Sequence, residues 1–133
     1  MTGMPGVLPF IPLTLFYVGD DPRMANRLMV PALVDSGATV NVLPRDIGER
    51  FGLNWYEQPT ILKPAGMIHE RPALALSLFA KVPGIRPQQL LFAWSEITSD
   101  KMQVLLGQTN FFDEFYVDFR KSLGYFEIIL KDE

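Results

Sequence analysis

The sequence contains no cysteine and a single histidine, His69. Without cysteine the chain cannot form disulfides, thiolate metal sites or a cysteine nucleophile, and one histidine rules out a metal site built from several histidines. Hydrolytic mechanisms that pair a serine or cysteine nucleophile with a histidine base are nearly excluded for the same reason. We therefore expect neither a metal ion nor another cofactor.

Clusters of basic residues and long hydrophobic runs are also missing. The 12 Lys and Arg residues are scattered and are outnumbered by 15 Asp and Glu, for a net charge of -3. Nucleic acid and membrane surfaces are poor partners for such a chain, because both bind basic patches. The apolar stretch 7–18 contains Pro9 and Pro12, has no basic residue before it and is too short to span a bilayer. We expect a cytoplasmic protein.

The residues that are present indicate one folded domain covering positions 1–133. Hydrophobic residues make up 48% of the sequence and charged residues 20%, a balance typical of globular proteins. A domain of this size can bury one ordinary hydrophobic core. Five aromatic residues near the C-terminus are spaced to lie mostly on one face and are expected to pack in that core: Phe111, Phe112, Phe115, Tyr116 and Phe119.

Short runs rich in Val, Ile, Leu and Phe, separated by Pro, Gly and Asp, predict an all-β fold. The expected strands are 10–18, 27–34, 55–62, 73–82, 89–94, 102–106, 116–119 and 125–130. Short helices are expected over 44–51, which begins with a proline and is followed by Gly52, and over 108–115. The strands 55–62 and 73–82 are expected to form a projecting hairpin around Lys63–Gly66.

Residues that could take part in catalysis stand directly after an apolar predicted strand, in the triplet Asp35-Ser36-Gly37. Such a triplet occurs by accident in roughly one chain of this length in twenty, and by itself it predicts an ordinary turn. A second element, Val104-Leu105-Leu106-Gly107, follows about seventy residues later, is again apolar and ends in glycine, and precedes a predicted short helix. The combination is far more specific than the triplet alone.

Together the two elements resemble the retroviral-type, or retropepsin-like, aspartic peptidases, in the form of a single-domain member of the bacterial kind. The resemblance extends from Phe10 to Leu130. It implies a closed β-barrel with a flap, which is a β-hairpin that closes over substrate, and one short helix after the Leu-Leu-Gly element. In this family the strand ending in that element packs under the catalytic loop.

The resemblance implies an aspartic endopeptidase in which Asp35 is the catalytic residue. Two carboxylates that share one proton activate a water molecule, and like charges so close together cannot both be ionised. The sequence has no second Asp-Ser/Thr-Gly triplet, so the second carboxylate must be Asp35 of another subunit. We therefore expect a homodimer that binds an extended polypeptide substrate and has an acid-shifted activity optimum.

The roles of the neighbouring residues also follow from the resemblance. Ser36 would join the hydrogen-bond network between the two catalytic loops, and Gly37 would let its backbone N–H approach the carboxylate of Asp35. Ala38 and Thr39 would contact substrate.

The flap and one ion pair are the points where this sequence departs from viral members. Gly66 and Met67 are the expected flap tip and substrate contacts, and Pro64 stiffens the hairpin. Viral members often pair an Asp two positions after the triplet with an Arg after the later glycine, whereas this chain has Thr39 and Gln108 there. The loss of that ion pair is expected to weaken the dimer.

Two alternative functions follow from these departures. The chain could have the same fold and triplet but serve as a peptide-binding or dimerisation module with little or no turnover. It could also be a β-barrel ligand-binding protein in which the triplet is coincidental. The intact triplet favours the enzyme.

Overall fold

The computed structural model describes residues 9–17, 26–60, 64–68, 71–120 and 125–131. The strands are β1 (Phe10–Tyr17), β2 (Asn26–Val34), β3 (Asn41–Leu43), β4 (Pro64–Ile68), β5 (Arg71–Lys81), β6 (Gln88–Ser95), β7 (Val104–Leu106), β8 (Phe115–Arg120) and β9 (Tyr125–Leu130). The helices are α1 (Arg45–Glu49), a 3₁₀ helix (Trp55–Thr60) and α2 (Phe111–Glu114).

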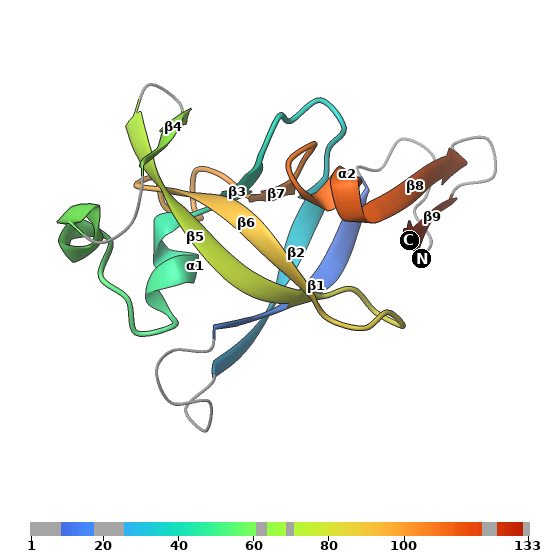
Figure 1. Cartoon of the computed structure of the whole chain (residues 1–133), viewed down its shortest axis with the longest axis horizontal. Coiled ribbons are helices and arrows are strands. Elements are labelled where there is room, and N and C mark those ends of the chain that lie inside the picture. The colour runs from blue at the N-terminus through green and yellow to red at the C-terminus, as the bar shows by residue number, and fades with distance from the viewer. Residues whose placement is uncertain (1–8, 18–25, 61–63, 69–70, 121–124, 132–133) are drawn as a thin grey trace.

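Within the described ranges, six strands close into a barrel in the order β1-β2-β7-β3-β6-β5 (Figure 1). The barrel closes because β1 pairs antiparallel with β2 along its whole length and with β5 through Thr14, Leu15 and Phe16. β4 adds to β5 outside this ring, and β8 pairs with β9 in a separate two-stranded sheet. The predicted all-β class is confirmed at this level, with a closed barrel and only short helices.

Alternation of apolar and polar residues explains why the strands bury one face. In β5, Leu74, Leu76 and Leu78 are buried, whereas Ser77 and Phe79 between and after them are exposed. Side chains two apart point to the same face of a strand, so one register places every second residue, and with it all three leucines, inside the barrel. The core also contains fully buried aromatic residues contributed by β6 and the C-terminal half, among them Phe92, Trp94, Phe111 and Phe115.

One predicted strand is wrong, and the hairpin is displaced as a result. Residues Trp55–Thr60 form a 3₁₀ helix, not the first part of a strand, and 61–63 lie outside the described residues. The hairpin exists, but its strands are β4 and β5, paired through Met67 with Pro72 and Ile68 with Arg71. Lys63–Gly66 is therefore not its turn. The last described pair of the hairpin is Ile68 with Arg71, and residues 69–70 between them, which include His69, lie outside the described residues.

The other predicted elements agree with the structure to within a few residues at each end. α1 is shorter than the expected 44–51, and Pro44 is its extended N-cap residue, not its first helical residue. Gly52 follows with φ of +86°, a left-handed conformation that favours glycine. The turn between β5 and β6 has Pro83 and then Gly84 with φ of +79°, which suits a type II turn.

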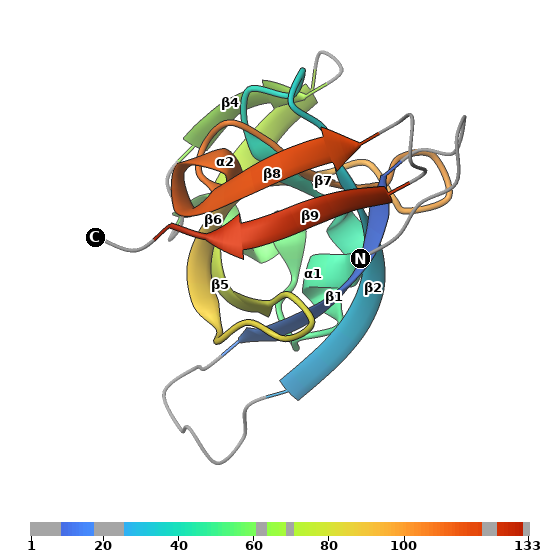
Figure 2. The same cartoon turned by 90° about the vertical axis from the view of Figure 1, so that its right-hand side faces the viewer.

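The β8–β9 hairpin lies across one side of the barrel (Figure 2). Phe115 is buried, and Val117, Ile128 and Leu130 on the same face are partly buried against the core. Tyr116, which the aromatic spacing placed in the core, is instead 62% exposed on the outer face. The prediction was wrong here because it continued a helical face into residues that form a strand, where neighbouring side chains point in opposite directions.

Candidate functional site

Asp35 is positioned by two parallel strands that end together. β2 pairs with β7 so that Val34 lies opposite Leu106, and Asp35 follows at the end of β2. Its backbone N–H donates a 2.9 Å hydrogen bond to the carbonyl oxygen of Leu106. The Asp-Ser-Gly triplet and the Leu-Leu-Gly element, about seventy residues apart in sequence, are thus direct neighbours in the fold.

The loop that follows, residues 35–40, will be called the Asp35 loop. It turns back on itself, because the N–H of Ala38 donates to the carbonyl oxygen of Asp35 at 3.1 Å. The N–H of Gly37 donates to Oδ1 of Asp35 at 2.9 Å, which is the bond the sequence predicted. No other hydrogen bond to this carboxylate occurs among the described residues. Asp35 is half-buried, whereas Ser36 and Gly37 are exposed, so the carboxylate is oriented by the loop and stays accessible.

Gly107 lets the Asp35 loop approach β7 closely. A Cβ atom at this position would lie 2.5 Å from the carbonyl oxygen of Val40 and 2.6 Å from that of Ala38. The next two residues then clamp the loop, because the N–H of Gln108 donates to Ala38 at 2.9 Å and the N–H of Thr109 donates to Thr39 at 3.0 Å. Ala38 and Thr39, the predicted substrate contacts, are therefore fixed through their backbone oxygens.

Gln108 has a role that sequence reasoning missed. Its side-chain Nε2 donates a 2.7 Å hydrogen bond to the carbonyl oxygen of Ser36, at the tip of the Asp35 loop. The sequence suggested only that an ion pair was lost at this position. The structure shows instead a hydrogen bond between uncharged groups, from Gln108 to the loop, which restrains the loop without an ion pair.

A buried amide network supports the same loop from below. Asn41 is fully buried at the start of β3, and its Oδ1 accepts a 2.8 Å hydrogen bond from the N–H of Gly107. Its Nδ2 donates to the carbonyl oxygen of Leu91 at 3.0 Å and to Oδ1 of Asn110 at 3.2 Å. The same Asn110 oxygen also accepts from the N–H of Leu91 at 2.9 Å. This network joins β3, β6 and the residues on both sides of Gln108, and a polar residue inside an apolar run was its only sequence signal.

Gly66 and Met67 lie in the second half of β4, where Met67 pairs with Pro72 of β5. The hairpin and the Asp35 loop, which connects β2 to β3, project from the same end of the barrel in both views (Figures 1 and 2). The five predicted residues of the Asp35 loop are thus brought together. Gly66 and Met67 belong to a separate element at the same end of the molecule.

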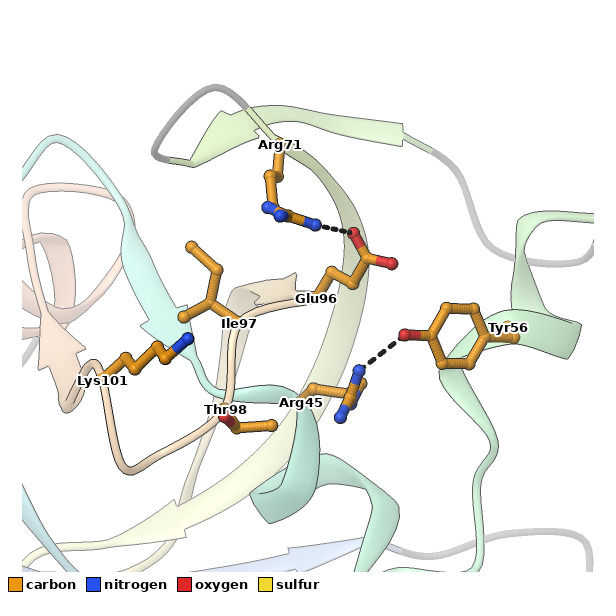
Figure 3. Close-up of a pocket in the computed structure, with 7 residues that line it drawn as sticks. All are labelled: Arg45, Tyr56, Arg71, Glu96, Ile97, Thr98 and Lys101. Atoms are coloured by element: carbon orange, nitrogen blue, oxygen red, sulfur yellow. Dashed lines mark hydrogen bonds and ion pairs between the residues drawn. The ribbon is translucent and has the colours of Figure 1, made fainter.

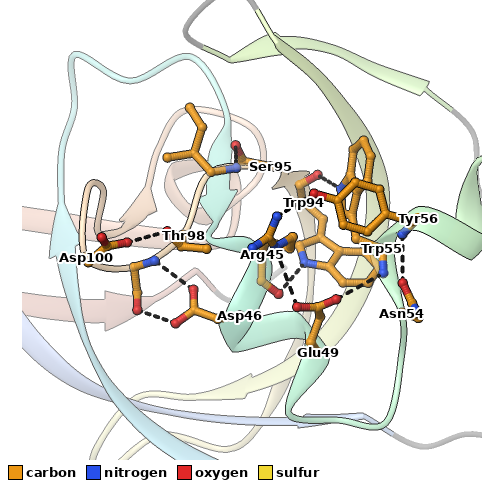
Figure 4. Close-up of polar contacts among 12 residues, drawn as sticks. Arg45, Asp46, Glu49, Asn54, Trp55, Tyr56, Trp94, Ser95, Thr98 and Asp100 are labelled. Carbon is orange, nitrogen blue, oxygen red and sulfur yellow. Dashed lines mark hydrogen bonds and ion pairs between the residues drawn. The ribbon is translucent and has the colours of Figure 1, made fainter.

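A second polar cluster fixes the segment 96–101, which leads from β6 to β7 (Figure 4). The N–H of Ser99 donates to Oδ1 of Asp46 at 2.7 Å, and the Ser99 hydroxyl donates to the other carboxylate oxygen. Burial raises the pKa of Asp46, but these hydrogen bonds and the charge of Arg45 outweigh it and hold the pKa below its ordinary value. The ionised carboxylate therefore holds the segment against α1.

Two tryptophans complete this support. The indole N–H of Trp55 donates to the carbonyl oxygen of Trp94 at 2.9 Å, and that of Trp94 donates to the carbonyl oxygen of Arg45 at 3.2 Å (Figure 4). Gly48 of α1 lies directly against the Trp94 ring. The 3₁₀ helix, β6 and α1 are thereby connected through buried donors, which explains why Trp55 is placed in a helical turn and not in a strand.

Several kinds of site are not found in the part of the chain that the structure describes. It contains no group of three or more His, Asp or Glu side chains that could hold a metal ion. None of its helices has the length and apolar character needed to cross a bilayer.

No family model matches this chain, and no curated protein matches it in sequence. Its function must therefore be argued from the geometry of the Asp35 loop.

Proposed function

We propose that the protein is an aspartic endopeptidase of the retropepsin-like type, active as a homodimer with one Asp35 from each subunit. The observation that supports this most is the arrangement of Asp35 itself. Its carboxylate is accessible, is oriented by the N–H of Gly37 and stands on a loop clamped to Gly107 and the two residues after it. A carboxylate oriented by a backbone donor on a loop with fixed geometry is what a general acid–base pair requires.

The proposed reaction uses two such carboxylates with one proton between them. The ionised Asp35 removes a proton from a water molecule whose oxygen attacks the peptide carbonyl carbon. The protonated Asp35 of the second copy gives its proton to the carbonyl oxygen. The first Asp35 then gives the proton it took from water to the amide nitrogen, and the second takes a proton back from a hydroxyl of the tetrahedral intermediate. The C–N bond breaks, which releases a carboxylic acid and an amine. Each residue alternates between acid and base, so neither carboxylate can act alone.

Two exposed surfaces support the pairing of two copies. Ser36 and Gly37 at the tip of the Asp35 loop are exposed and available to a second loop. Tyr116 and Ile129 lie opposite each other on β8 and β9 and are 62% and 54% exposed. Asp118 and Glu127 are the next cross-strand pair on the same face, so its apolar part consists of Tyr116 and Ile129, whose burial by a partner would add stability. We propose the second copy as that partner.

The proposed substrate is an extended polypeptide lying between the β4–β5 hairpin and the Asp35 loop. β4 stands at the end of its sheet, so one of its edges is not paired with any described strand. An extended peptide can add to such an edge through main-chain hydrogen bonds, while side-chain pockets supply selectivity. The substrate contacts proposed for Ala38, Thr39, Gly66 and Met67 belong to this arrangement.

The experiment is digestion of an unfolded protein at mildly acid pH, with and without pepstatin, by the parent chain and by Asp35→Asn. We expect cleavage by the parent that pepstatin inhibits, and no cleavage by the variant. Asparagine has the same shape as aspartate, so circular dichroism and sedimentation should show an unchanged fold and dimer. Cleavage by Asp35→Asn at the parent rate would refute the mechanism. An inert parent that still binds peptides would favour the peptide-binding module.

A further inference from the structure

A pocket of about 450 Å³ lies beside Arg71, the first residue of β5 (Figure 3). Arg71 contributes from β5, Arg45 from the first residue of α1 and Tyr56 from the 3₁₀ helix. The remaining wall is the segment 96–101, from which Ile97 and Lys101 point into the same space. None of these side chains belongs to the Asp35 loop.

Positive charge dominates the lining, so we call this the basic pocket. It contains three cationic side chains, Arg45, Arg71 and Lys101, against one carboxylate, Glu96. Arg71 and Glu96 pair at 3.2 Å, and Arg71 remains 61% exposed in its side chain. The ammonium of Lys101 has no ion-pair partner among the described residues. The pocket thus retains positive charge after its internal pair is formed.

Arg45 is held as a fixed donor in the pocket wall. Its Nη1 donates to the hydroxyl of Tyr56 at 2.6 Å, and its guanidinium lies 5.4 Å from the centre of that ring. Its Nε is buried and lies 3.6 Å from Oε1 of Glu49, which is an ion-pair contact but too long for a hydrogen bond. The guanidinium therefore keeps unused hydrogen-bonding capacity in a fixed orientation.

The opposite wall is fixed as well. The N–H of Arg45 donates to the carbonyl oxygen of Ile97 at 2.8 Å, which joins α1 to the segment 96–101. The hydrogen bonds between Ser99 and Asp46 hold the same segment two residues further on. Fixed walls lower the conformational cost of binding a ligand.

The position of the basic pocket relates it to the proposed peptidase site. Lys101 stands five residues before Leu106, whose carbonyl oxygen accepts the hydrogen bond from Asp35. Five residues span at most about 17 Å. A bound peptide in strand conformation advances about 3.3 Å per residue. The basic pocket therefore lies within about six substrate residues of the cut bond and next to the hairpin that would cover them.

We propose that the basic pocket binds a carboxylate of the polypeptide substrate, so that the protein selects chains with an acidic group a few residues from the cleavage position. Planar guanidinium groups bind carboxylates in a fork-like geometry, and a free ammonium adds a point charge. That the carboxylate belongs to a polypeptide rests on the proposed function. Its source is either an Asp or Glu side chain or the C-terminus of the chain.

The test is the binding of labelled twelve-residue peptides to Asp35→Asn, measured by fluorescence anisotropy. One set carries a single Glu at successive positions, with Gln counterparts, and all have amidated C-termini. A second set lacks acidic side chains and compares free with amidated C-termini. We expect a free carboxylate in one of the two sets to strengthen binding about five-fold, an advantage that shrinks at high salt. The set that responds identifies the source of the carboxylate.

The same titrations with Lys101→Gln assign the effect to the pocket. Lys101 is exposed, so its substitution should leave the thermal unfolding curve unchanged. The variant should lose most of the advantage, Lys101→Arg should keep it, and Lys81→Gln at the far end of β5 is the matched control and should behave like the parent. Equal binding of charged and neutral peptides in both sets, an advantage that survives in Lys101→Gln, or no peptide binding at all would overturn the proposal.

Failure of this proposal can be told apart from failure of the peptidase. Mapping the cut sites of the parent chain on a denatured protein reports both. Cleavage without acidic enrichment near the cut would overturn the basic pocket and leave the peptidase standing. Binding of acidic peptides without any cleavage would support the pocket and count against the peptidase.

Discussion

Replacing Asn41 should destabilise the protein and weaken activity together, because the buried amide supports the Asp35 loop. In Asn41→Ala the buried N–H of Gly107 loses its partner, and the carbonyl oxygen of Leu91 and Oδ1 of Asn110 each lose a donor. An unsatisfied buried group costs about 1–3 kcal/mol, and not all costs add, so we expect a total near 3 kcal/mol. For a domain of this size that corresponds to a melting temperature lower by roughly 10 °C.

The assay is thermal and urea unfolding, followed by peptide cleavage at a temperature where the variant is folded. The matched control is Asn54→Ala, which removes an exposed 3.0 Å hydrogen bond to the N–H of Tyr56 and should cost at most about 1 kcal/mol. We expect cleavage to fall at least ten-fold in Asn41→Ala, because the loop loses the support of Gly107. Equal stability losses in the two variants would refute this account of the network.

A second substitution tests the direction of the hydrogen bonds. Asn41→Asp keeps an acceptor for the N–H of Gly107 but aims a carboxylate at two acceptors, the oxygens of Leu91 and Asn110. At neutral pH it should be at least as destabilising as the alanine variant. Part of the loss should be recovered in acid, where the introduced carboxyl binds a proton and can donate. A stability difference that does not change with pH would contradict the assigned donors and acceptors.

Three further predictions concern close packing and pH. Gly107→Ala places a Cβ 2.6 Å from the carbonyl oxygen of Ala38. It should lower the free energy of unfolding by about 1–3 kcal/mol and kcat/KM by about 100-fold. An unchanged kcat/KM would show that the position of the Asp35 loop is not critical. Gly48→Ala places a Cβ 2.3 Å from Nε1 of Trp94. Urea unfolding should show a similar decrease in the free energy of unfolding, whereas kcat/KM should be nearly unchanged. The lowered pKa of Asp46 stabilises the folded state above its ordinary value of 3.8, and this contribution is lost as pH falls through the folded-state pKa. The stability difference between the parent and Asp46→Asn should therefore be constant near neutral pH and shrink in acid, and a difference that grows there would contradict the stated hydrogen bonds.

The strand pattern and the pairing of the two glycine-containing elements could be predicted from the sequence. Five of the six barrel strands lie in alternating or continuous apolar runs that predicted them, whereas β3 was not predicted because its three residues are too few to form a recognisable pattern. The proximity of Asp35 to Leu106 followed from resemblance, since nothing local in either segment requires the other. The 3₁₀ helix at Trp55–Thr60 was missed because its placement depends on a hydrogen bond from Trp55 to Trp94, a residue far along the chain.

The supporting network and the basic pocket could not have been predicted for a related reason. Asn41 is separated from Leu91 by 50 residues and from Asn110 by 69, so its partners are set by the closure of the barrel. Similarly, Arg45 and Arg71 stand in unrelated segments that the sequence alone reads as ordinary surface charges. Long-range polar contacts of this kind become visible only when the strand order is known.

The most direct test of the central claim is a mixing experiment between the parent chain and Asp35→Asn. If each active site takes one Asp35 from each of two copies, adding an equal amount of the variant to a fixed amount of parent converts half of the parent chains into inactive mixed dimers. Once the subunits have exchanged, the rate of peptide cleavage should fall to about half, and a larger excess of variant should reduce it further. A rate that stays constant as the variant is added would show that a single chain carries the complete active site.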